Sequence, residues 1–576
     1  METVSSNIAT TPAGTAPENN AHFYLLIASG LILLPFLLFH FRAFDDNRLT
    51  SWQWTFAGLN MAWFPVRLGA GLAAAFLLSR LRLARRRPLL LLGSSFLAGA
   101  MFWGEPEVIV DASRYFTQAK QLAANGPGYF FAQWGKEIFA WTDLPLMPFC
   151  YGLVFKYFGE SRIAIQILTT LIFSATVLLT HGLGRLLWDE ETGFHGALLL
   201  LGIPYLYTQI PLLLVDVPTM FFLLLALYLF ILALRRGGNI RVLLAGLAIF
   251  GAFYVKFSTW VFLAGFGMVF LLHLSAAPLA TCKRGGAVAL WAALFIGLLF
   301  YLEQDLLLAQ IRFLLDYQKA GLDRWGESHV STFLFQIHPL ISGAAAYSLI
   351  EALRKRDLVH GNIAVFVLLI FVLDLQRIRY ILPLFPFITL LAARGMNAVN
   401  DRGARRFLVF GVVHSSLIIA LTAYLPFLEN MSAVNIREAG EFLNSRGIEA
   451  VEVIPLARPG AVVNPEVAIP LLDYFTTARI GYEEVPARPE LAAYRQSALR
   501  FTWEYRPPDD IYRPPLYRPP LASTSGRQPL VVLSSRPVPE LPPALLRKSA
   551  LFRHSRTFSR ATGVFLDQTV VSVYYD

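Results

Sequence analysis

The chain has 576 residues, of which 56% are hydrophobic and only 15% are charged. These values lie far from those of soluble globular proteins, so they exclude a soluble enzyme and predict an α-helical, polytopic membrane protein. The net charge of +10 would suggest nucleic acid as a partner of a soluble protein. Here the basic residues gather in short loops between apolar stretches, so they indicate orientation in the bilayer, and no nucleic-acid partner is expected.

Apolar stretches follow one another along most of the chain. Residues 1–20 are polar and lack the basic region and cleavage site of a signal peptide, so we expect a disordered cytoplasmic tail there. The stretches 194–210 and 242–255 are short for full spans, which predicts tilted, broken or partly re-entrant helices. In all, about 13 transmembrane helices are expected, near residues 22–41, 58–79, 88–103, 162–186, 194–210, 212–234, 242–255, 257–274, 286–302, 333–352, 358–374, 379–397 and 407–427.

Basic clusters set the predicted orientation, because short cytoplasmic loops are rich in Lys and Arg. A cytoplasmic N-terminus places every cluster inside and places residues 104–161, 303–332 and 428–576 outside. The expected location is therefore the cell (inner) membrane, with an extracytoplasmic C-terminal domain. The clusters lie within Arg80–Arg87, at Arg235-Arg236 and Lys283-Arg284, at Arg354-Lys355-Arg356, and at Arg402, Arg405 and Arg406.

The predicted domains are the tail, two N-terminal helices in residues 21–87, a central membrane domain in 88–428 that includes the outer loop 104–161, and the C-terminal domain in 429–576. This last part has a helix-like opening at Ile436–Arg446 and strand-like runs at Glu449–Ile454, Pro529–Leu533 and Val564–Tyr575, which predict a small α/β domain. Three Tyr-Arg-Pro-Pro copies, which begin at Tyr505, Tyr512 and Tyr517, favour extended backbone. They form either a loop excursion or a docking strip for an anionic partner.

Asp111 opens the first large outer loop, in the motif Asp111-Ala112-Ser113-Arg114-Tyr115. Apolar residues at helical spacing in Ser113–Asn125 predict a helix that lies along the membrane surface. Asp111 precedes this helix, so its carboxylate either caps free backbone N–H groups or carries chemistry on a membrane-bound substrate.

Charged residues also recur at the outer ends of later spans. Asp216 precedes Pro218 at a predicted helix start, which is consistent with helix capping as well as with function. Lys256 and the pair Arg377 and Arg379 lie on the side that the positive-inside rule disfavours. An anionic group held at the outer surface would explain these cations, because the Arg fork and the Lys point charge both bind phosphate oxygens. The alternative is that they snorkel to lipid headgroups.

His338 lies at the mouth of another span, and Glu327 and His329 lie in the preceding outer loop. Imidazole and carboxylate groups are common metal ligands, but this spacing is not diagnostic of any metal site. We interpret His338 as a polar residue at the membrane interface.

The order of these elements resembles the polyprenyl-phosphate-dependent glycosyltransferases of the GT-C superfamily, in particular the branch with the lipid A aminoarabinose transferases and the protein O-mannosyltransferases. The resemblance covers roughly residues 88–427. It is carried by Asp111-Ala112-Ser113-Arg114-Tyr115 with Ala119-Lys120, by Leu144-Pro145-Leu146 leading to Phe155-Lys156-Tyr157-Phe158-Gly159, by Gly182-Leu183-Gly184-Arg185-Leu186-Leu187, by Asp216-Val217-Pro218, by Lys256, and by Arg379-Tyr380-Ile381-Leu382-Pro383 before Leu384-Phe385-Pro386.

The resemblance implies a membrane enzyme that transfers a hexose or pentose from a polyprenyl-phosphate donor to an extracytoplasmic lipid, glycan or protein, with inversion at the anomeric carbon. It implies catalytic roles for Asp111, Asp143 and Asp216, binding of the donor phosphate by Lys256, Arg377, Arg379 and Tyr380, and orientation of the substrate by Arg114, Tyr115 and His338. No cofactor is certain, and a divalent cation stays open.

Two departures from the family pattern affect specificity. Many relatives have a second acidic residue where this chain has Ala112, so Asp143 is expected to supply the second carboxylate. The aminoarabinose branch tends to have Lys-Pro-Pro where this chain has Asp143-Leu144-Pro145, which argues against that sugar.

The competing function is that of a transporter or lipid flippase. It is disfavoured because no clear inverted repeat is seen and because the charged candidates gather at one membrane face and not at the midplane. A non-catalytic scaffold would leave Asp111, Lys256 and the two arginines unexplained.

Overall fold

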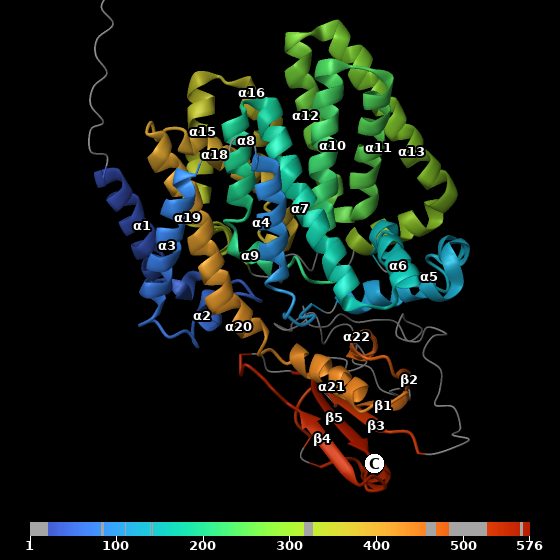
Figure 1. Cartoon of the computed structure of the whole chain (residues 1–576). Helices are drawn as coiled ribbons and strands as arrows, with labels where there is room; N and C mark the ends of the chain where they lie inside the picture. Colours follow the sequence, from blue (N-terminus) through green and yellow to red (C-terminus); the bar gives the residue numbers. More distant parts are fainter. Residues whose placement is uncertain are drawn as a thin grey trace, which may run out of the picture.

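The computed structural model describes residues 21–81, 86–109, 111–138, 140, 142–315, 327–456, 468–482, 527–538, 540–564 and 568–576. It consists of a large helical bundle and a small sheet domain at one end of that bundle (Figure 1). The predicted fold class is therefore confirmed. The tail 1–20 and the Tyr-Arg-Pro-Pro copies lie outside the described residues.

The helices of the bundle run between the two ends of the molecule in Figure 1. Among the described residues, seven helical segments are long and apolar enough to cross a membrane, which bears out a multi-pass membrane protein without fixing the count of 13. The helices of the bundle are α1 (Ala21–His40), α3 (Phe64–Arg80), α4 (Arg87–Ala100), α7 (Arg162–Leu187), α8 (Glu190–Leu200), α10 (Asp216–Arg236), α11 (Asn239–Val255), α12 (Trp260–Ala276), α13 (Pro278–Phe313), α15 (Pro339–Lys355), α16 (Leu358–Val372), α18 (Phe385–Met396) and α19 (Arg402–Ile419).

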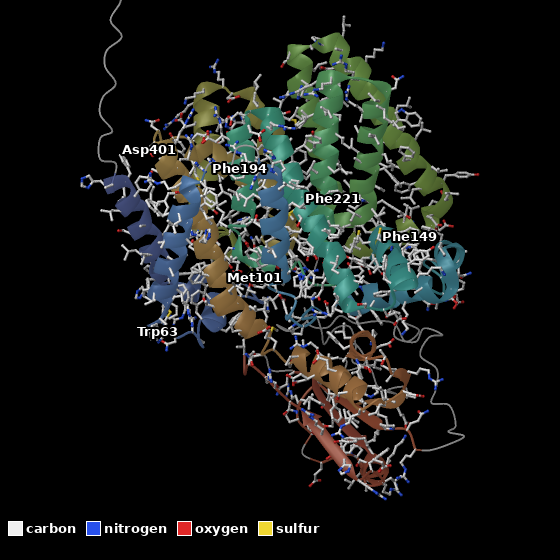
Figure 2. The ribbon with its side chains drawn as sticks, in the orientation of Figure 1. Trp63, Met101, Phe149, Phe194, Phe221 and Asp401 are labelled. Atoms are coloured by element: carbon white, nitrogen blue, oxygen red, sulfur yellow. The ribbon has the colours of Figure 1, made fainter. Side chains whose placement is uncertain are left out.

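The outside of this bundle carries apolar side chains. Trp63 is 60% exposed and Met101 is 51% exposed, and both side chains lie on the outside of the bundle in Figure 2. Large exposed apolar surfaces are unfavourable in water, so this surface fits contact with lipid tails.

The stretch predicted at 194–210 is broken, as expected. Helix α8 ends at Leu200, and the single turn α9 (Pro204–Tyr207) follows it. An 11-residue helix is only about 16 Å long, so α8 does not cross a bilayer by itself. It is buried from Thr192 to Leu200. Gly184 of α7 and Gly193 of α8 allow close contact, because a Cβ on Gly184 would lie 2.5 Å from the Gly193 Cα.

Several predicted boundaries differ from the structure, and α13 (Pro278–Phe313) extends well beyond the span expected at 286–302. The span expected at 333–352 begins instead at Pro339, after a short π-helix (Ser331–Gln336). His338 has extended backbone and accepts a hydrogen bond from the Leu340 N–H through its Nδ1 atom (3.2 Å), so it caps α15. The apolar residues of the π-helix gave this stretch the composition of a membrane span.

The outer loop forms the predicted helix. Helix α5 (Asp111–Gln133) contains a break at Gly126, whose φ of +87° favours glycine, and α6 (Leu146–Phe158) packs against it. Both helices lie at the end of the bundle that faces the sheet domain (Figure 1).

The C-terminal domain is a five-stranded mixed sheet with strand order β2-β1-β3-β5-β4. Strands β1 (Ala450–Leu456), β2 (Arg479–Tyr482) and β3 (Leu530–Ser534) are parallel, and β5 (Val570–Tyr575) runs antiparallel to both β3 and β4 (His554–Phe558). Helices α21 (Ala433–Ser445), α22 (Ala468–Phe475) and α24 (Pro543–Ser549) complete the domain. Three strands coincide with the predicted strand-like runs.

The C-terminal domain is attached directly to α5. The Lys120 ammonium lies 2.6 Å from an Asp473 carboxylate oxygen of α22 and 3.0 Å from a Glu160 carboxylate oxygen at the end of α6. Beside these ion pairs, Phe116 of α5 packs against Tyr474 of α22, with ring centroids 5.1 Å apart. The sheet domain therefore shares a hydrophobic core with the helix that begins at Asp111.

Candidate active site

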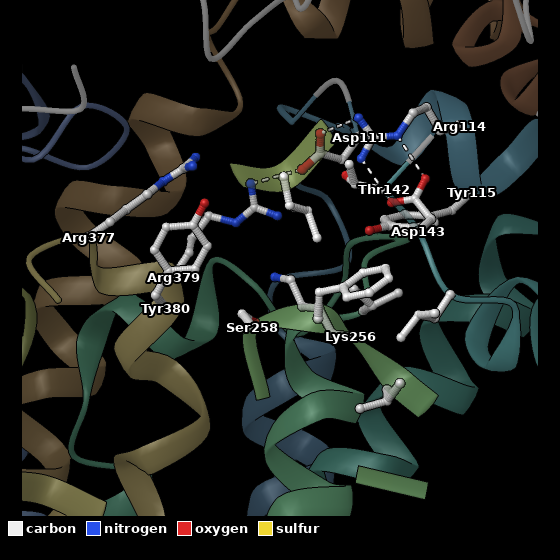
Figure 3. A pocket seen from close by; sticks show the side chains of 15 residues that line it. Asp111, Arg114, Tyr115, Thr142, Asp143, Lys256, Ser258, Arg377, Arg379 and Tyr380 are labelled. Carbon is white, nitrogen blue, oxygen red and sulfur yellow. Dashed lines mark hydrogen bonds and ion pairs between the residues drawn. The ribbon is translucent and has the colours of Figure 1, made fainter. Parts of the chain in front are cut away.

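Helix ends from distant parts of the sequence surround one cleft at the end of the bundle that faces the sheet domain. The start of α5 and the start of α10 meet the end of α11 and the single turn α17 (Ile378–Ile381) there. The cleft has a volume of about 670 Å³. Figure 3 shows its charged side chains directed toward one another.

Local sequence explains why these side chains point into the cleft. Pro218 lies in the first turn of α10, where a missing N–H costs nothing, so the helix begins at Asp216. Lys256 has extended backbone (φ −164°, ψ 138°) and ends α11. Pro383 and Pro386 break the next segment into short turns, so the turn that carries Arg379 is separate from α18.

Arg379 joins the two acidic helix starts. Its Nη1 atom lies 3.0 Å from the Asp111 carboxylate, and its Nη2 atom lies 2.8 Å from the Asp216 carboxylate. The second oxygen of Asp216 lies 2.7 Å from the Lys256 ammonium. Asp216 is only 1% exposed, so these two cations replace the water that it would otherwise bind.

Arg114 forms the second ion-pair cluster. It contacts Asp143 in two places, through Nε at 3.0 Å and Nη2 at 3.1 Å, and its Nη1 atom lies 3.3 Å from Asp111. The Asp143 carboxylate also accepts a hydrogen bond from the Gln118 amide at 3.2 Å. Asp143 is thus held by a bidentate pair, while Asp111 is shared between two arginines.

The electrostatics of Asp111 follow from this arrangement. Burial by itself would raise the pKa of Asp111, but the positive charges of Arg114, Arg379, Arg377 and Lys256 outweigh it and hold the pKa well below its usual range. Asp111 is therefore ionised at neutral pH.

The charges that line the cleft sum to a positive value. Two carboxylates (Asp111 and Asp143) and four cations (Arg114, Lys256, Arg377 and Arg379) line it, which leaves a net charge of +2. The buried Asp216, which pairs with Arg379 and Lys256, lowers the sum to +1. The Tyr380 ring adds a cation–π surface, with the Lys256 ammonium 5.9 Å and the Arg377 guanidinium 5.4 Å from its centroid. The cleft suits a ligand with at least one negative charge.

Eight of the ten residues expected in the site line this cleft, namely Asp111, Arg114, Tyr115, Asp143, Lys256, Arg377, Arg379 and Tyr380. Asp216 does not line it but forms ion pairs with Arg379 and Lys256. His338 lies away from the cleft, because it is buried among the helices, where its Nε2 lies 3.2 Å from the Ser415 hydroxyl. Its cap on α15 and this contact explain its position outside the lining of the cleft.

Sequence reasoning missed two polar residues of the lining, Thr142 and Ser258. Thr142 directly precedes Asp143, and Ser258 lies two positions after Lys256. This proximity to predicted residues was the available signal.

The described residues contain no group of three or more His, Cys, Asp and Glu side chains that could hold a metal ion. The carboxylates of Asp111 and Asp216 both contact the Arg379 guanidinium. Cations of the protein thus contact every oxygen of these two carboxylates.

Comparisons with known proteins agree with this architecture. Residues 143–301 match the family model described as dolichyl-phosphate-mannose-protein mannosyltransferase. No curated protein sequence matches the chain.

Among solved structures, the chain is similar to ArnT from Cupriavidus metallidurans bound to undecaprenyl phosphate, with 10% identity and a TM-score of 0.53 over 84% of this chain and 97% of that one. The apo state of the same ArnT gives 11% identity, the same TM-score of 0.53, and the same coverage of 84% and 97%. AglB from Archaeoglobus fulgidus, in complex with an inhibitory peptide and a dolichol-phosphate, gives 12% identity and a TM-score of 0.46 over 69% of this chain and 65% of that one.

The ArnT match covers both the bundle and the attached domain, and the family match covers the centre of the bundle. In fold, the chain is therefore similar to ArnT over most of its length.

Proposed function

We propose that this protein transfers a sugar from a polyprenyl-phosphate donor to an acceptor hydroxyl in the cleft, with inversion at the anomeric carbon. The observation that carries the proposal is the position of Arg379, which contacts both Asp111 and Asp216 in a cleft of net positive charge. The mannosyltransferase family match and the ArnT bound to undecaprenyl phosphate support the same donor class.

The cations stabilise the leaving group in this reaction. The lipid phosphate gains negative charge as the bond from its oxygen to the anomeric carbon breaks. Arg379, Lys256 and Arg377 stabilise that charge, and the Tyr380 ring holds two of these cations in place. Asp216 keeps Arg379 and Lys256 fixed through its two short ion pairs.

Asp111 orients the acceptor hydroxyl and receives its proton. With two arginines beside it, the carboxylate is a weak base before the donor binds. A donor phosphate adds negative charge near Arg379, which raises the pKa of Asp111 toward a value that suits a general base. Donor binding thus prepares the proton acceptor.

The proposal also covers the sugar, the acceptor, the orientation in the membrane and the divalent cation. Loss of the lysine of the aminoarabinose branch at Asp143-Leu144-Pro145 favours a different hexose or pentose, on a lipid, glycan or protein acceptor. The basic clusters at Arg235-Arg236, Arg354-Lys355-Arg356 and Arg402–Arg406 lie at the bundle end opposite the sheet domain, which supports a cytoplasmic N-terminus and an extracytoplasmic cleft. A divalent cation enters no step.

The test uses the full-length protein in lipid nanodiscs with a panel of polyprenyl-phosphate sugars, scored by release of polyprenyl phosphate. Asp111→Asn should lower turnover by about 10² to 10⁴-fold and leave donor binding intact. Glu351→Gln is the matched control, because Glu351 pairs with Lys355 near the opposite end of the bundle. Full turnover by Asp111→Asn would refute the mechanism.

A transporter would behave differently in the same experiment. It would move labelled donor across the bilayer of sealed vesicles without releasing polyprenyl phosphate. Release of polyprenyl phosphate by the wild type, absent in Asp111→Asn, would therefore separate the two functions.

A further inference from the structure

A second cleft lies next to the first. It has a volume of about 370 Å³ and is lined by Asn47, Arg48, Leu49, Ile109, Tyr205, Glu327, Arg377 and Arg379. Arg377 and Arg379 also line the first cleft, so the two spaces meet at this pair. Figure 3 shows Arg379 between Arg377 at one edge of the view and Arg114 at the other.

One wall of the second cleft comes from the N-terminal hairpin, the segment between α1 and α3. Its residues Asn47, Arg48 and Leu49 lie more than 50 positions before the first residue of the loop helix α5, and they lie outside the family match at 143–301. A segment far away in sequence therefore supplies an arginine to the neighbourhood of the cleft.

The hairpin is fixed firmly enough to position that arginine. Asp45 is fully buried and accepts hydrogen bonds from the Ser331 hydroxyl (2.5 Å), the Gln336 amide (2.8 Å) and the Trp52 N–H (2.7 Å). Asp46, the next residue, accepts a hydrogen bond from the Ser328 N–H at 2.9 Å.

Asn47 fixes the other side of Arg48. Its side-chain oxygen accepts hydrogen bonds from the Leu49 N–H (3.0 Å) and the Thr50 N–H (2.8 Å). Thr50 in turn donates to the Gln336 side chain at 2.7 Å. Both flanks of Arg48 are thus tied down, which lowers the entropy lost when its side chain binds a ligand.

The charges in this cleft favour an anion. Three guanidinium groups, from Arg48, Arg377 and Arg379, face one carboxylate, Glu327, which leaves a net charge of +2. One Glu327 oxygen accepts a hydrogen bond from the Ile378 N–H at 3.0 Å. Leu49, Ile109 and the ring of Tyr205 provide apolar walls beside the charges.

We infer that this second cleft is a subsite for an anionic group of the acceptor, a phosphate or a carboxylate, bound by Arg48 and Arg377. The inference rests on the proposed function. The single phosphate of the donor occupies the first cleft beside Lys256 and Arg379. Ile109 lies two positions before Asp111, so an acceptor anchored in the second cleft presents its neighbouring hydroxyl to the Asp111 carboxylate.

The test uses full-length protein in nanodiscs and sn-glycerol 1-phosphate as a soluble probe, with binding measured by calorimetry. The wild type should bind the probe when the first cleft is already saturated with undecaprenyl phosphate. Arg48→Gln should weaken probe binding by about tenfold or more and change the affinity for undecaprenyl phosphate by less than twofold. Arg48→Lys should recover part of the affinity, because it keeps the charge and loses the fork.

Arg67→Gln is the matched control, because Arg67 lies in the first turn of α3, directly after the hairpin, is exposed and lines neither cleft. It should bind both ligands like the wild type. An equal loss of undecaprenyl phosphate binding in Arg48→Gln would assign the cleft to the donor and overturn the inference, as would absence of probe binding to the wild type. Failure of the wild type to bind undecaprenyl phosphate would instead refute the proposed function.

Discussion

The carboxylates of two regions of this protein have opposite surroundings. In the first cleft, Asp111 and Asp216 face the cations Arg379 and Lys256 at 2.7 to 3.0 Å. In the N-terminal hairpin, Asp45 accepts hydrogen bonds from neutral groups.

This difference in surroundings indicates a different role for each region. Ion pairs that a phosphate can displace keep their carboxylates charged and allow a ligand to exchange with them. Neutral donors cannot compensate fully for lost hydration, so burial raises the pKa of Asp45 to about 7 even though the bonds from Ser331, Trp52 and Gln336 lower it. The first cluster is built for an anionic ligand, and the second holds a loop in one conformation.

The largest effect is expected from Arg379→Ala. It leaves Asp111 and Asp216 without their shared cation and removes stabilisation of the leaving phosphate, so turnover should fall by about 10³-fold. Arg379→Lys, with one point charge in place of a fork, should recover only part of this loss. Single-turnover rates at saturating donor provide the measurement, and a rate within threefold of wild type would contradict the role of the ion pairs.

Lys256→Met should have a smaller effect, because Arg379 still faces Asp216. We expect the KM for the donor to rise by about tenfold or more, with a smaller fall in kcat. A change in kcat alone would show that Lys256 acts only in the transition state.

Asp45→Asn should mainly change stability. Because the pKa of Asp45 is raised in the folded state, the folded protein binds a proton that the unfolded chain releases between about pH 4 and pH 7. Stability from this group is complete below about pH 4 and is lost as the pH rises to about 7, with a slope of up to about 1.4 kcal/mol per pH unit. Thermal melts of wild type and variant from pH 4.5 to 8 should differ in slope over that window, and parallel curves would contradict the assignment.

Lys120→Met tests the attachment of the C-terminal domain. Its ion pairs with Asp473 and Glu160 are partly exposed, so the loss should be about 1 kcal/mol or less. Limited proteolysis should cut the segment between the bundle and the sheet domain faster in the variant. Lys136→Met, an exposed lysine at the far end of the loop, is the control.

The smallest effect is expected from chelation. Asp111 and Asp216 are neutralised by Arg379, so treatment with EDTA should leave turnover within about twofold of the untreated enzyme. A loss restored by one divalent cation would show that the charges of the first cluster are completed by a metal.

Much of the fold follows from the sequence, because apolar stretches, basic clusters and helix-starting prolines are local signals. They placed Asp111, Asp216, Lys256 and Arg379 at helix ends on one membrane face, and the structure brings these four side chains together. The strand-like runs of the C-terminal domain were local signals of the same kind.

The pairing within the site could not be predicted in this way. Which carboxylate Arg114 contacts, and the presence of Arg48 beside Arg377, depend on how distant helices pack. The position of His338 depends on such packing too, because a π-helix occupies the first part of the span expected at 333–352 and leaves His338 as the cap of α15.

The attachment of Lys120 to Asp473 has a mechanical consequence. Asp111 and Lys120 lie nine positions apart on one unbroken stretch of α5, so about 13 Å of rigid helix separates the Asp111 carboxylate, the proposed proton acceptor, from the sheet domain. A rotation of that domain by about 4° would swing Asp111 by about 1 Å, a displacement that can cost about 10²-fold in rate. A movement of the sheet domain would thus displace the Asp111 carboxylate, although the domain contributes no side chain to the lining of the cleft among the residues described.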